Sequence, residues 1–395
     1  MSIVIGVDLT RLTIGYSGGV GVFSHELTRA LHESRGENKI IIYCQKQDLD
    51  YFNHTFSGIE VIGFSLQKNQ ILGFFRRVAI YLFRSQFILS LLKNIEYRKL
   101  KIEIEDRCNL VYTPTTYLNF YSKLIPTVVS LHDIQHKAFP DFFSKKQKIF
   151  RELATQITLN RTTAIQVSSQ SMKKDFFDFY EELNLSSKIF VIKEGVNLEK
   201  FKISEKHNIL HREKLKFIYP AALWPHKNHS LFVRALGQSK IKDFSEIQFT
   251  GYTFDKANWL RIHLRENGVS NYKINGVIEL NQLIDLYRDS DVVVSCSLYE
   301  SSSLPLIEGI ASGCLVLASD IKPHLEMSKE MGLILFESNS ILSLVNKLDY
   351  LLENFEKLKL QYNNNQTKVI TYDWKVLAES YWENFEIEVG KYAQN

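Results

Sequence analysis

Cysteine is scarce in this sequence, and its four cysteines do not form a recognisable metal or redox pattern. Cys44, Cys108, Cys296 and Cys314 lie far apart, and no two of them have CxxC spacing. The sequence therefore predicts a reduced, cytoplasmic protein without structural zinc. At 395 residues it also exceeds any small disulfide scaffold and has room for roughly two or three domains.

Long hydrophobic runs are absent as well. No stretch approaches the roughly 18 uncharged apolar residues that a membrane-spanning helix needs. The N-terminal run MSIVIGVDLT is short, lacks a preceding basic region and soon meets Asp8, so we expect a buried first strand rather than a signal peptide. Hydrophobic residues at 45% and charged residues at 23% are ordinary for a globular protein, which excludes long disordered tracts.

A strong charge of one sign is also lacking. The formal net charge is +4, which is too small to require a nucleic-acid partner. Residues 68–101 are an exception, with eight basic residues, many aromatic and aliphatic ones, and Glu96 as their single acid. A basic, aromatic helix too short to span a bilayer is typical of an element on an anionic membrane surface. The alternative is an amphipathic helix that docks on its own domain.

Short apolar runs alternate with helical patterns from end to end, which predicts an α/β fold of parallel sheets covered by helices. The predicted strands are Ile3–Val7, Lys39–Tyr43, Leu110–Tyr112, Thr127–Leu131, Ala164–Val167, Phe190–Ile192, Phe217–Tyr219, Ile247–Thr250, Val292–Ser295 and Leu315–Ala318. The main predicted helices are Val20–Glu33, Lys145–Thr163, Lys227–Gly237, Leu280–Arg288, Pro305–Ser312 and Ile341–Glu353.

The polar segment Gly195–Lys216 has no clear period and is interpreted as a linker between two similar halves. We expect an N-terminal Rossmann-like domain over residues 1–200 and a second over residues 201–371. A C-terminal helix over residues 372–392 is expected to cross back to the first domain. Ligand sites in such domains lie at the carboxyl ends of strands and in the cleft between domains.

Three short segments carry candidate chemistry at these strand ends. The loop Ser17–Gly21 opens a helix, where glycine lets the backbone approach an anion, although a plain tight turn explains it equally well. Lys227 follows a strand and can neutralise a phosphate, or it belongs to a solvated loop. His132-Asp133 follows another strand and can contact a substrate, or the histidine caps the next turn.

The segment Tyr299–Gly309 is the most informative one. Pro305 stands where a helix begins, and the preceding serines offer backbone N–H groups to an anion. Glu300 and Glu308 flank that helix start and suit sugar hydroxyls, which donate hydrogen bonds to carboxylates. Glu308 can instead satisfy the helix start, as a capping-box glutamate does.

The longer segment Tyr299–Gly313, YESSSLPLIEGIASG, resembles the E-x7-E signature of retaining glycosyltransferases of family 4. Further pieces resemble that family in the same order along the chain: Gly18–Gly21 (glycine loop), His132-Asp133 (His-Asp motif of bacterial polysaccharide members), Val191–Phe201 (exit from the first domain), Lys227 (phosphate-binding lysine) and Asn275–Val277 with Leu283, Tyr287 and Asp291 (nucleotide-base segment). The likeness covers nearly the whole chain and is greatest to the mannosyltransferases of O-antigen and capsule assembly.

This resemblance implies the GT-B fold, with two Rossmann-like doubly wound domains facing a cleft. It implies metal-independent, retaining transfer of a hexose from a nucleotide-diphosphate sugar, with GDP-mannose favoured and no further cofactor. The acceptor is expected to be a lipid-linked or polysaccharide glycan at the inner face of the cytoplasmic membrane. The implied site residues are Lys227, Glu300 and His132 as catalytic groups, Gly18, Gly19, Val277, Ser302, Ser303, Leu304 and Glu308 for the donor, and Asp133 on the acceptor side.

Two positions depart from the family pattern. Ala222 stands where an arginine usually precedes the lysine by five positions, and Ser301-Ser302-Ser303 replaces G-F-G. These departures keep open a non-catalytic nucleotide-sugar-binding or scaffold subunit of a glycan synthase. A nucleotide-sugar epimerase or phosphorylase on the same fold is a second alternative.

Overall fold

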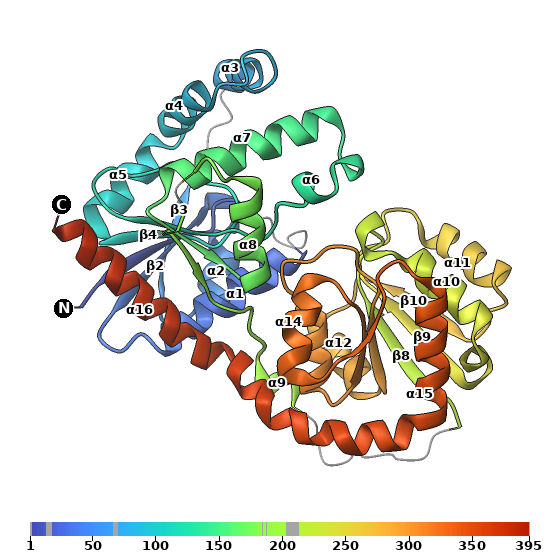
Figure 1. Cartoon of the computed structure of the whole chain (residues 1–395). Helices are drawn as coiled ribbons and strands as arrows, with labels where there is room; N and C mark the ends of the chain where they lie inside the picture. Colours follow the sequence, from blue (N-terminus) through green and yellow to red (C-terminus); the bar gives the residue numbers. More distant parts are fainter. Residues whose placement is uncertain are drawn as a thin grey trace. The chain divides into compact units, whose positions relative to one another are not determined.

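The computed structural model describes residues 2–12, 18–65, 70–183, 185–186, 188–202 and 213–394 (Figure 1). The chain forms two compact units. Unit 1 comprises Met1–Lys193 and Trp374–Asn395, and unit 2 comprises Glu194–Asp373. Of the segment interpreted as a linker, residues 203–212 lie outside the described residues, while Val196 and Phe201 are buried in the core of unit 2.

Unit 1 is built on a parallel sheet of seven strands in the order β3-β2-β1-β4-β5-β6-β7. The strands are β1 (Val4–Asp8), β2 (Lys39–Gln45), β3 (Glu60–Phe64), β4 (Leu110–Thr113), β5 (Thr127–Ser130), β6 (Ala164–Val167) and β7 (Ile189–Val191). Every residue of β4, β5 and β6 is buried. Such fully buried strands are expected where helices cover both faces of a parallel sheet.

The helices of unit 1 include one from the far end of the chain (Figure 1). They are α1 (Gly18–Glu33), α2 (Leu49–Thr55), α3 (Gln70–Tyr81), α4 (Gln86–Glu96), α5 (Arg98–Arg107), α6 (Gln135–Ala138), α7 (Lys145–Arg161), α8 (Gln170–Phe179) and α16 (Trp374–Ala393). Helix α16 lies along α1, where the indole N–H of Trp382 donates to the Leu31 carbonyl at 3.1 Å. Tyr381 and Phe385 of α16 are fully buried in the same core cluster as Phe23 and Leu27 of α1.

The basic segment 68–101 differs from the single helix that the sequence suggests. It forms the separate helices α3 and α4, and α5 begins at Arg98. Arg84 between α3 and α4 has a left-handed φ of 49°, which breaks the helical path there. Lys68 lies outside the described residues.

Unit 2 is built on a parallel sheet of six strands in the order β10-β9-β8-β11-β12-β13. The strands are β8 (Leu215–Pro220), β9 (Ser245–Thr250), β10 (Tyr272–Gly276), β11 (Val292–Ser295), β12 (Leu315–Ser319) and β13 (Ile334–Phe336). The helices are α9 (Leu198–Phe201), α10 (His229–Gln238), α11 (Ala257–Glu266), α12 (Leu280–Arg288), α13 (Leu304–Ala311), α14 (Lys322–Met331) and α15 (Ile341–Tyr362). The direction of strand addition reverses between β8 and β11, which is where ligands bind in sheets of this kind.

Three strands, β3, β10 and β13, were not anticipated from the sequence, and all three lie at sheet edges. Their residues are mostly half-exposed. In β3 and β10, polar residues or glycine interrupt the apolar run that marks a central strand, whereas β13 is the short apolar segment ILF and was missed. Among the described residues, no helix is both long enough and apolar enough to reach across a bilayer.

The packing of α16 predicts a large loss of stability when a buried side chain of this helix is replaced by alanine. Phe385→Ala should lower the free energy of unfolding by about 3–5 kcal/mol, because a fully buried phenyl ring leaves a cavity. Ile387→Ala is the control on the same helix and should cost less than about 0.5 kcal/mol, since Ile387 is exposed. Urea unfolding followed by circular dichroism measures both, and equal losses would contradict this packing.

Candidate active site

The loops after β8 and β11 are joined directly by one hydrogen bond and indirectly through Tyr219 of β8. The Leu298 N–H donates to the His226 carbonyl at 2.7 Å. The Cys296 N–H donates to the Tyr219 hydroxyl at 3.1 Å, and that hydroxyl donates to the Lys227 carbonyl. Because Tyr219 is buried, these bonds fix the backbone of Lys227 against the β11 loop.

Lys227 and Glu300 meet across these two loops. The Lys227 ammonium forms an ion pair with Glu300, and both side chains are mostly buried. Burial alone would raise the pKa of Glu300. The nearby charges of Lys227 and His226, with hydrogen bonds from Lys227 and Ser297, outweigh burial and hold that pKa below its ordinary value. Glu300 is therefore ionised at neutral pH, and the structure brings two of the predicted site residues together at the switch point.

The serine run leads into α13, whose first turn carries Leu304 and Pro305. Ser303 does not cap the helix with its side chain. Its hydroxyl instead lies 2.6 Å from Nε2 of His324, whose Nδ1 lies 2.7 Å from the Ser319 carbonyl oxygen. Since a carbonyl only accepts, Nδ1 carries the proton and Nε2 accepts from Ser303. Burial lowers the pKa of His324 to about 4, so this histidine is neutral at pH 7.

Glu308 lies inside α13 and is almost fully buried. The Tyr287 hydroxyl donates to its carboxylate at 2.8 Å and also contacts the Pro305 carbonyl at 3.2 Å. Tyr287 comes from α12, so one buried side chain fixes both this carboxylate and the start of α13. Next to Glu308, Gly309 packs so closely on β11 that an added Cβ would lie 2.4 Å from Val293 Cγ1.

Val277 follows β10 and is exposed. Gly276 before it has a φ of +68°, which favours glycine, and its carbonyl accepts from the Gly251 N–H at 2.8 Å. The β10 loop is thereby attached to the β9 loop at the same edge of the sheet, and Val277 is presented to solvent.

The other predicted residues belong to unit 1. Gly18, with a φ of +52°, and Gly19 open α1, and an added Cβ on either would meet no atom within 4 Å. Ser17 of that loop lies outside the described residues. The Nε2 atom of His132 donates to the Pro114 carbonyl at 2.7 Å, and the ring packs edge-on against Phe23 at 4.7 Å. His132 is thus held by the β4 loop and by α1.

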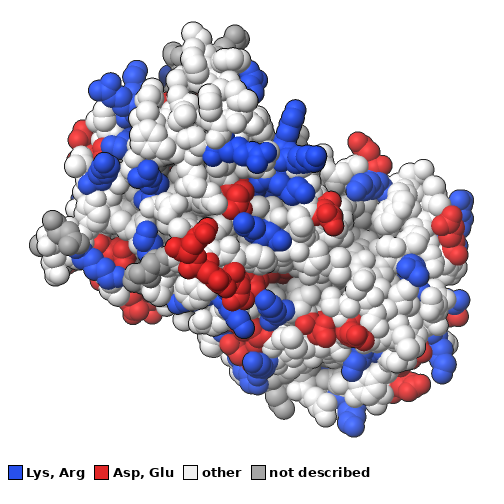
Figure 2. Space-filling model, turned by 45° about the horizontal axis from the view of Figure 1, so that its top comes forward, with Lys and Arg blue, Asp and Glu red and all other residues white. Residues whose placement is uncertain are grey.

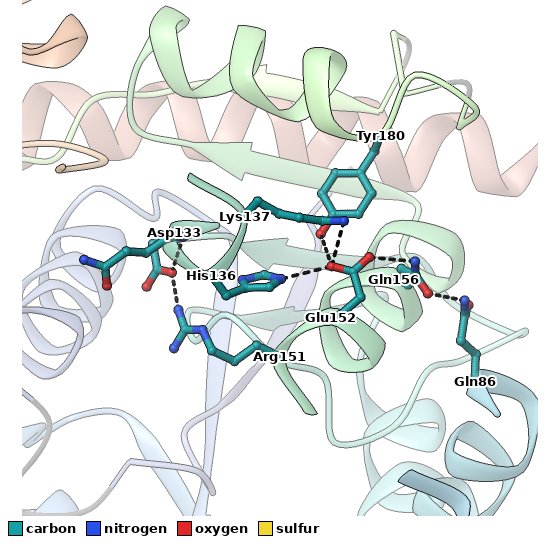
Figure 3. Close-up of polar contacts among 9 residues, drawn as sticks. Gln86, Asp133, His136, Lys137, Arg151, Glu152, Gln156 and Tyr180 are labelled. Carbon is teal, nitrogen blue, oxygen red and sulfur yellow. Dashed lines mark hydrogen bonds and ion pairs between the residues drawn. The ribbon is translucent and has the colours of Figure 1, made fainter. Parts of the chain in front are cut away.

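Asp133 forms an ion pair with Arg151 of α7 and accepts from the Gln135 N–H at 3.0 Å (Figure 3). Beside it, Figure 3 shows a second cluster centred on Glu152. His136 at 3.1 Å, Lys137 at 3.0 Å and Tyr180 at 3.2 Å all face its carboxylate.

Burial opposes ionisation of Glu152, but the bonds and charges of His136 and Lys137 outweigh burial and lower its pKa. Gln156 donates to the same carboxylate at 2.7 Å and accepts a hydrogen bond from Gln86 of α4. The loop after β5 is therefore braced by a charged network on α7.

Several residues of this site were not identified from the sequence. Arg151, His324 and Tyr219 contact predicted residues, but each lies in a segment whose local pattern carries no functional signal. Ala222, in place of the usual arginine, supplies only a backbone carbonyl that accepts from Trp224 N–H at 2.7 Å. Among the residues that the structure describes, no group of three His, Cys, Asp or Glu side chains could hold a metal ion.

Two family models match the chain in succession. The model described as Glycosyltransferase Family 4 matches residues 17–200, and the model described as Glycosyl transferases group 1 matches residues 199–369. The chain is 24% identical over 389 residues to the O-antigen chain mannosyltransferase RfbU of Salmonella typhimurium, which covers 95% of this chain and 99% of RfbU.

Solved structures share the fold. The Anabaena protein HepE, in complex with UDP and glucose, has a TM-score of 0.71 at 17% identity, covering 97% of this chain and 99% of HepE. WaaG, a glycosyltransferase involved in lipopolysaccharide biosynthesis, has a TM-score of 0.70 at 14% identity, covering 98% of this chain and 100% of WaaG. The predicted α/β fold of GT-B type, with two parallel sheets, is thereby confirmed.

The neutral His324 predicts a defined pH dependence of stability. Its folded-state pKa of about 4 lies below the ordinary 6.5, so the unfolded chain binds more protons in that interval. Stability should therefore fall as pH drops from about 6.5 toward 4, with His324 contributing a loss of about 2 kcal/mol by pH 5. Urea unfolding measures the drop in the free energy of unfolding between pH 7 and pH 5. This drop should be about 2 kcal/mol smaller in His324→Gln than in the wild type. An equal drop in the two proteins would contradict the conclusion that His324 is buried and neutral.

Proposed function

Because the chain belongs to the glycosyltransferases of family 4, we propose that it transfers mannose from a nucleotide-diphosphate sugar to a lipid-linked or surface polysaccharide acceptor. The observation that carries this proposal is the Lys227–Glu300 pair at the switch point of the unit 2 sheet. It combines a cation for a diphosphate with a carboxylate for sugar hydroxyls.

Lys227 serves as the group that stabilises the leaving diphosphate. Negative charge grows on the phosphate oxygen as the bond to the sugar breaks, so a fixed ammonium lowers the barrier. The backbone N–H groups of Ser302, Ser303 and Leu304 at the start of α13 act in the same direction, because a helix N-terminus attracts anions. His226, a basic side chain that helps to lower the pKa of Glu300, stands in for the family's arginine, which is replaced by Ala222.

The positions of the carboxylates support the remaining donor contacts that we propose. Glu300 accepts hydrogen bonds from the sugar hydroxyls and Glu308 from the ribose. The hydroxyl of Tyr287, which fixes Glu308, supports this role for the carboxylate. Val277, which is exposed, is proposed to face the nucleotide base. In unit 1, the open backbone at Gly18 and Gly19 and the braced His132 serve the sugar and phosphate, and Asp133 serves the acceptor.

The proposed reaction retains the anomeric configuration and needs neither a metal nor a separate protein base. The bond from the anomeric carbon to the phosphate oxygen breaks, and a bond from that carbon to the acceptor oxygen forms on the same face. The acceptor's proton passes to the leaving phosphate oxygen, so atoms and charges balance. Lys227 and the α13 N-terminus take the charge-stabilising role that a metal ion has in other transferases.

Mannose, carried as GDP-mannose, is proposed because the relative RfbU is an O-antigen chain mannosyltransferase. The same likeness supports the proposal of a lipid-linked glycan acceptor, with the reaction at the inner face of the cytoplasmic membrane. The competing candidate, a donor-binding subunit without turnover, is favoured by Ala222 and by the serine run that replaces glycines.

Lys227→Ala tests the proposal. Release of nucleoside diphosphate from GDP-, UDP-, dTDP- and ADP-sugars should identify one donor, and Lys227→Ala should lower turnover of that donor about 10²-fold or more. Lys273→Ala, an exposed lysine on β10, is the matched control and should keep wild-type turnover.

Near-normal turnover in Lys227→Ala would overturn the role of this lysine. A donor that binds but is never turned over, with or without a glycan acceptor, would favour the scaffold alternative. NMR of the transferred sugar should show the same anomeric configuration as in the donor, and an inverted product would contradict the retaining mechanism.

A further inference from the structure

Helices α3 and α4 carry an apolar face that the protein itself does not cover. On α3, Ile71, Phe74, Phe75 and Tyr81 are exposed and recur at the three- and four-residue spacing of one helix face. On α4 the exposed side chains Phe87, Ile88, Leu91 and Ile95 repeat in the same way. Soluble proteins rarely leave so many large apolar side chains together in water, and such patches mark interaction surfaces.

The opposite face of this helical hairpin holds it to unit 1. Ala79 and Ile80 of α3 and Leu89 of α4 are buried against Leu153 and Ile157 of α7. The hairpin is therefore docked by its inner side, and its outer apolar face is not required to complete a core. The sequence-based alternative of an ordinary docked amphipathic helix accounts for the inner face alone.

The turn between the two helices is also exposed. Leu82 is 73% exposed and Phe83 is 61% exposed. Arg84 follows them with a left-handed φ, and Ser85 then caps α4 by accepting from the Ile88 N–H at 3.2 Å. The turn thus presents two consecutive apolar side chains and a cation at one tip.

The charges around the apolar face are positive. The sequence has no acidic residue between Glu60 and Glu96. Arg76 is neutralised by Glu96 at 3.1 Å, and Lys93 is buried with its ammonium donating to the Leu118 carbonyl at 2.6 Å, so neither serves the outer surface. Arg77 and Arg84 are exposed, and within the described part of the chain neither forms an ion pair.

Figure 2, in which the end of unit 1 that carries α3 and α4 is turned forward, shows a mainly uncharged surface with Lys and Arg side chains at its margins. We propose that the α3–α4 hairpin docks on an anionic phospholipid bilayer, with Leu82 and Phe83 inserted among the lipids and Arg77 and Arg84 on the headgroup phosphates. Apolar side chains next to unpaired arginines match the two layers of such a surface: acyl chains and anionic headgroups.

The helices lie on the membrane rather than across it. Helix α3 has 12 residues and α4 has 11, so each is at most about 18 Å long, against about 30 Å of hydrocarbon core. The hairpin is thus the surface by which the enzyme proposed above contacts the membrane, and to this extent the proposal rests on the proposed function. It is tested without donor or acceptor, so its failure and the failure of the transfer reaction are separate results.

Flotation of the full-length protein with vesicles tests the proposal. Wild-type protein should bind vesicles of equal parts phosphatidylcholine and phosphatidylglycerol, and should bind pure phosphatidylcholine at least ten-fold more weakly. Arg77→Glu with Arg84→Glu should reduce binding to the anionic vesicles by about 25-fold or more, because each basic residue near such a surface contributes about five-fold. Leu82→Asp with Phe83→Asp should reduce it by about ten-fold or more.

Matched controls are available on unit 2. Arg261→Glu with Arg265→Glu makes the same charge change on the exposed side of α11, and Leu342→Asp replaces a leucine that is 71% exposed on α15. Both controls should bind anionic vesicles as the wild type does. Circular dichroism and donor binding of the hairpin variants should be unchanged, since the substituted side chains are exposed and lie outside the candidate site.

Three results would overturn the proposal. The first is wild-type protein that does not float with anionic vesicles, and the second is a hairpin variant that floats as well as the wild type. The third is a wild-type dimer in sedimentation that Leu82→Asp with Phe83→Asp converts to monomer, because the apolar face would then be covered by a second copy of the chain.

Discussion

A mostly buried ammonium group needs a negative partner, and the arrangement of unit 2 at its switch point follows from that constraint. Lys227 has Glu300 as its partner, and Tyr219 anchors the loop that carries the lysine. The two loops follow β8 and β11, the adjacent strands at which the direction of sheet growth reverses. The pair is therefore held by buried hydrogen bonds rather than by flexible side chains alone, and we infer that a donor diphosphate takes over the partnership with Lys227.

The central part of each sheet could be predicted from the sequence, because its strands are buried on both faces and appear as apolar runs. Strands β6 and β11 have the predicted bounds Ala164–Val167 and Val292–Ser295. The edge strands β3 and β10 could not be predicted in the same way, since polar residues or glycine interrupt their apolar runs. The third edge strand, β13, is an apolar segment of three residues that was missed. The break between α3 and α4 was missed too, because the apolar pattern continues through Arg84 without a proline or glycine.

Within the site, the segment from Glu300 to Gly309 was recognisable because helix-start chemistry and the family signature coincide in consecutive residues. The contacts that support it could not be predicted. No sequence signal pointed to His324, and Tyr287 was marked only as part of the nucleotide-base segment. His324 reaches Ser303 and Tyr287 reaches Glu308, each from 21 positions away in sequence, and only the folded chain brings them into contact. Arg151 likewise joins Asp133 from α7. The side chains proposed to contact substrate can thus be recognised from local sequence patterns. The side chains that orient them are identified only by the tertiary packing.

The most direct test of the account is a crystal structure of the protein with GDP bound. The account predicts that the diphosphate lies at the start of α13, with the Lys227 ammonium about 3 Å from a phosphate oxygen. It also predicts that the ribose hydroxyls donate to Glu308 and that Glu300 no longer pairs with Lys227. A nucleotide bound away from the β8 and β11 loops, or one that leaves the Lys227–Glu300 ion pair intact, would contradict the assignment of this site.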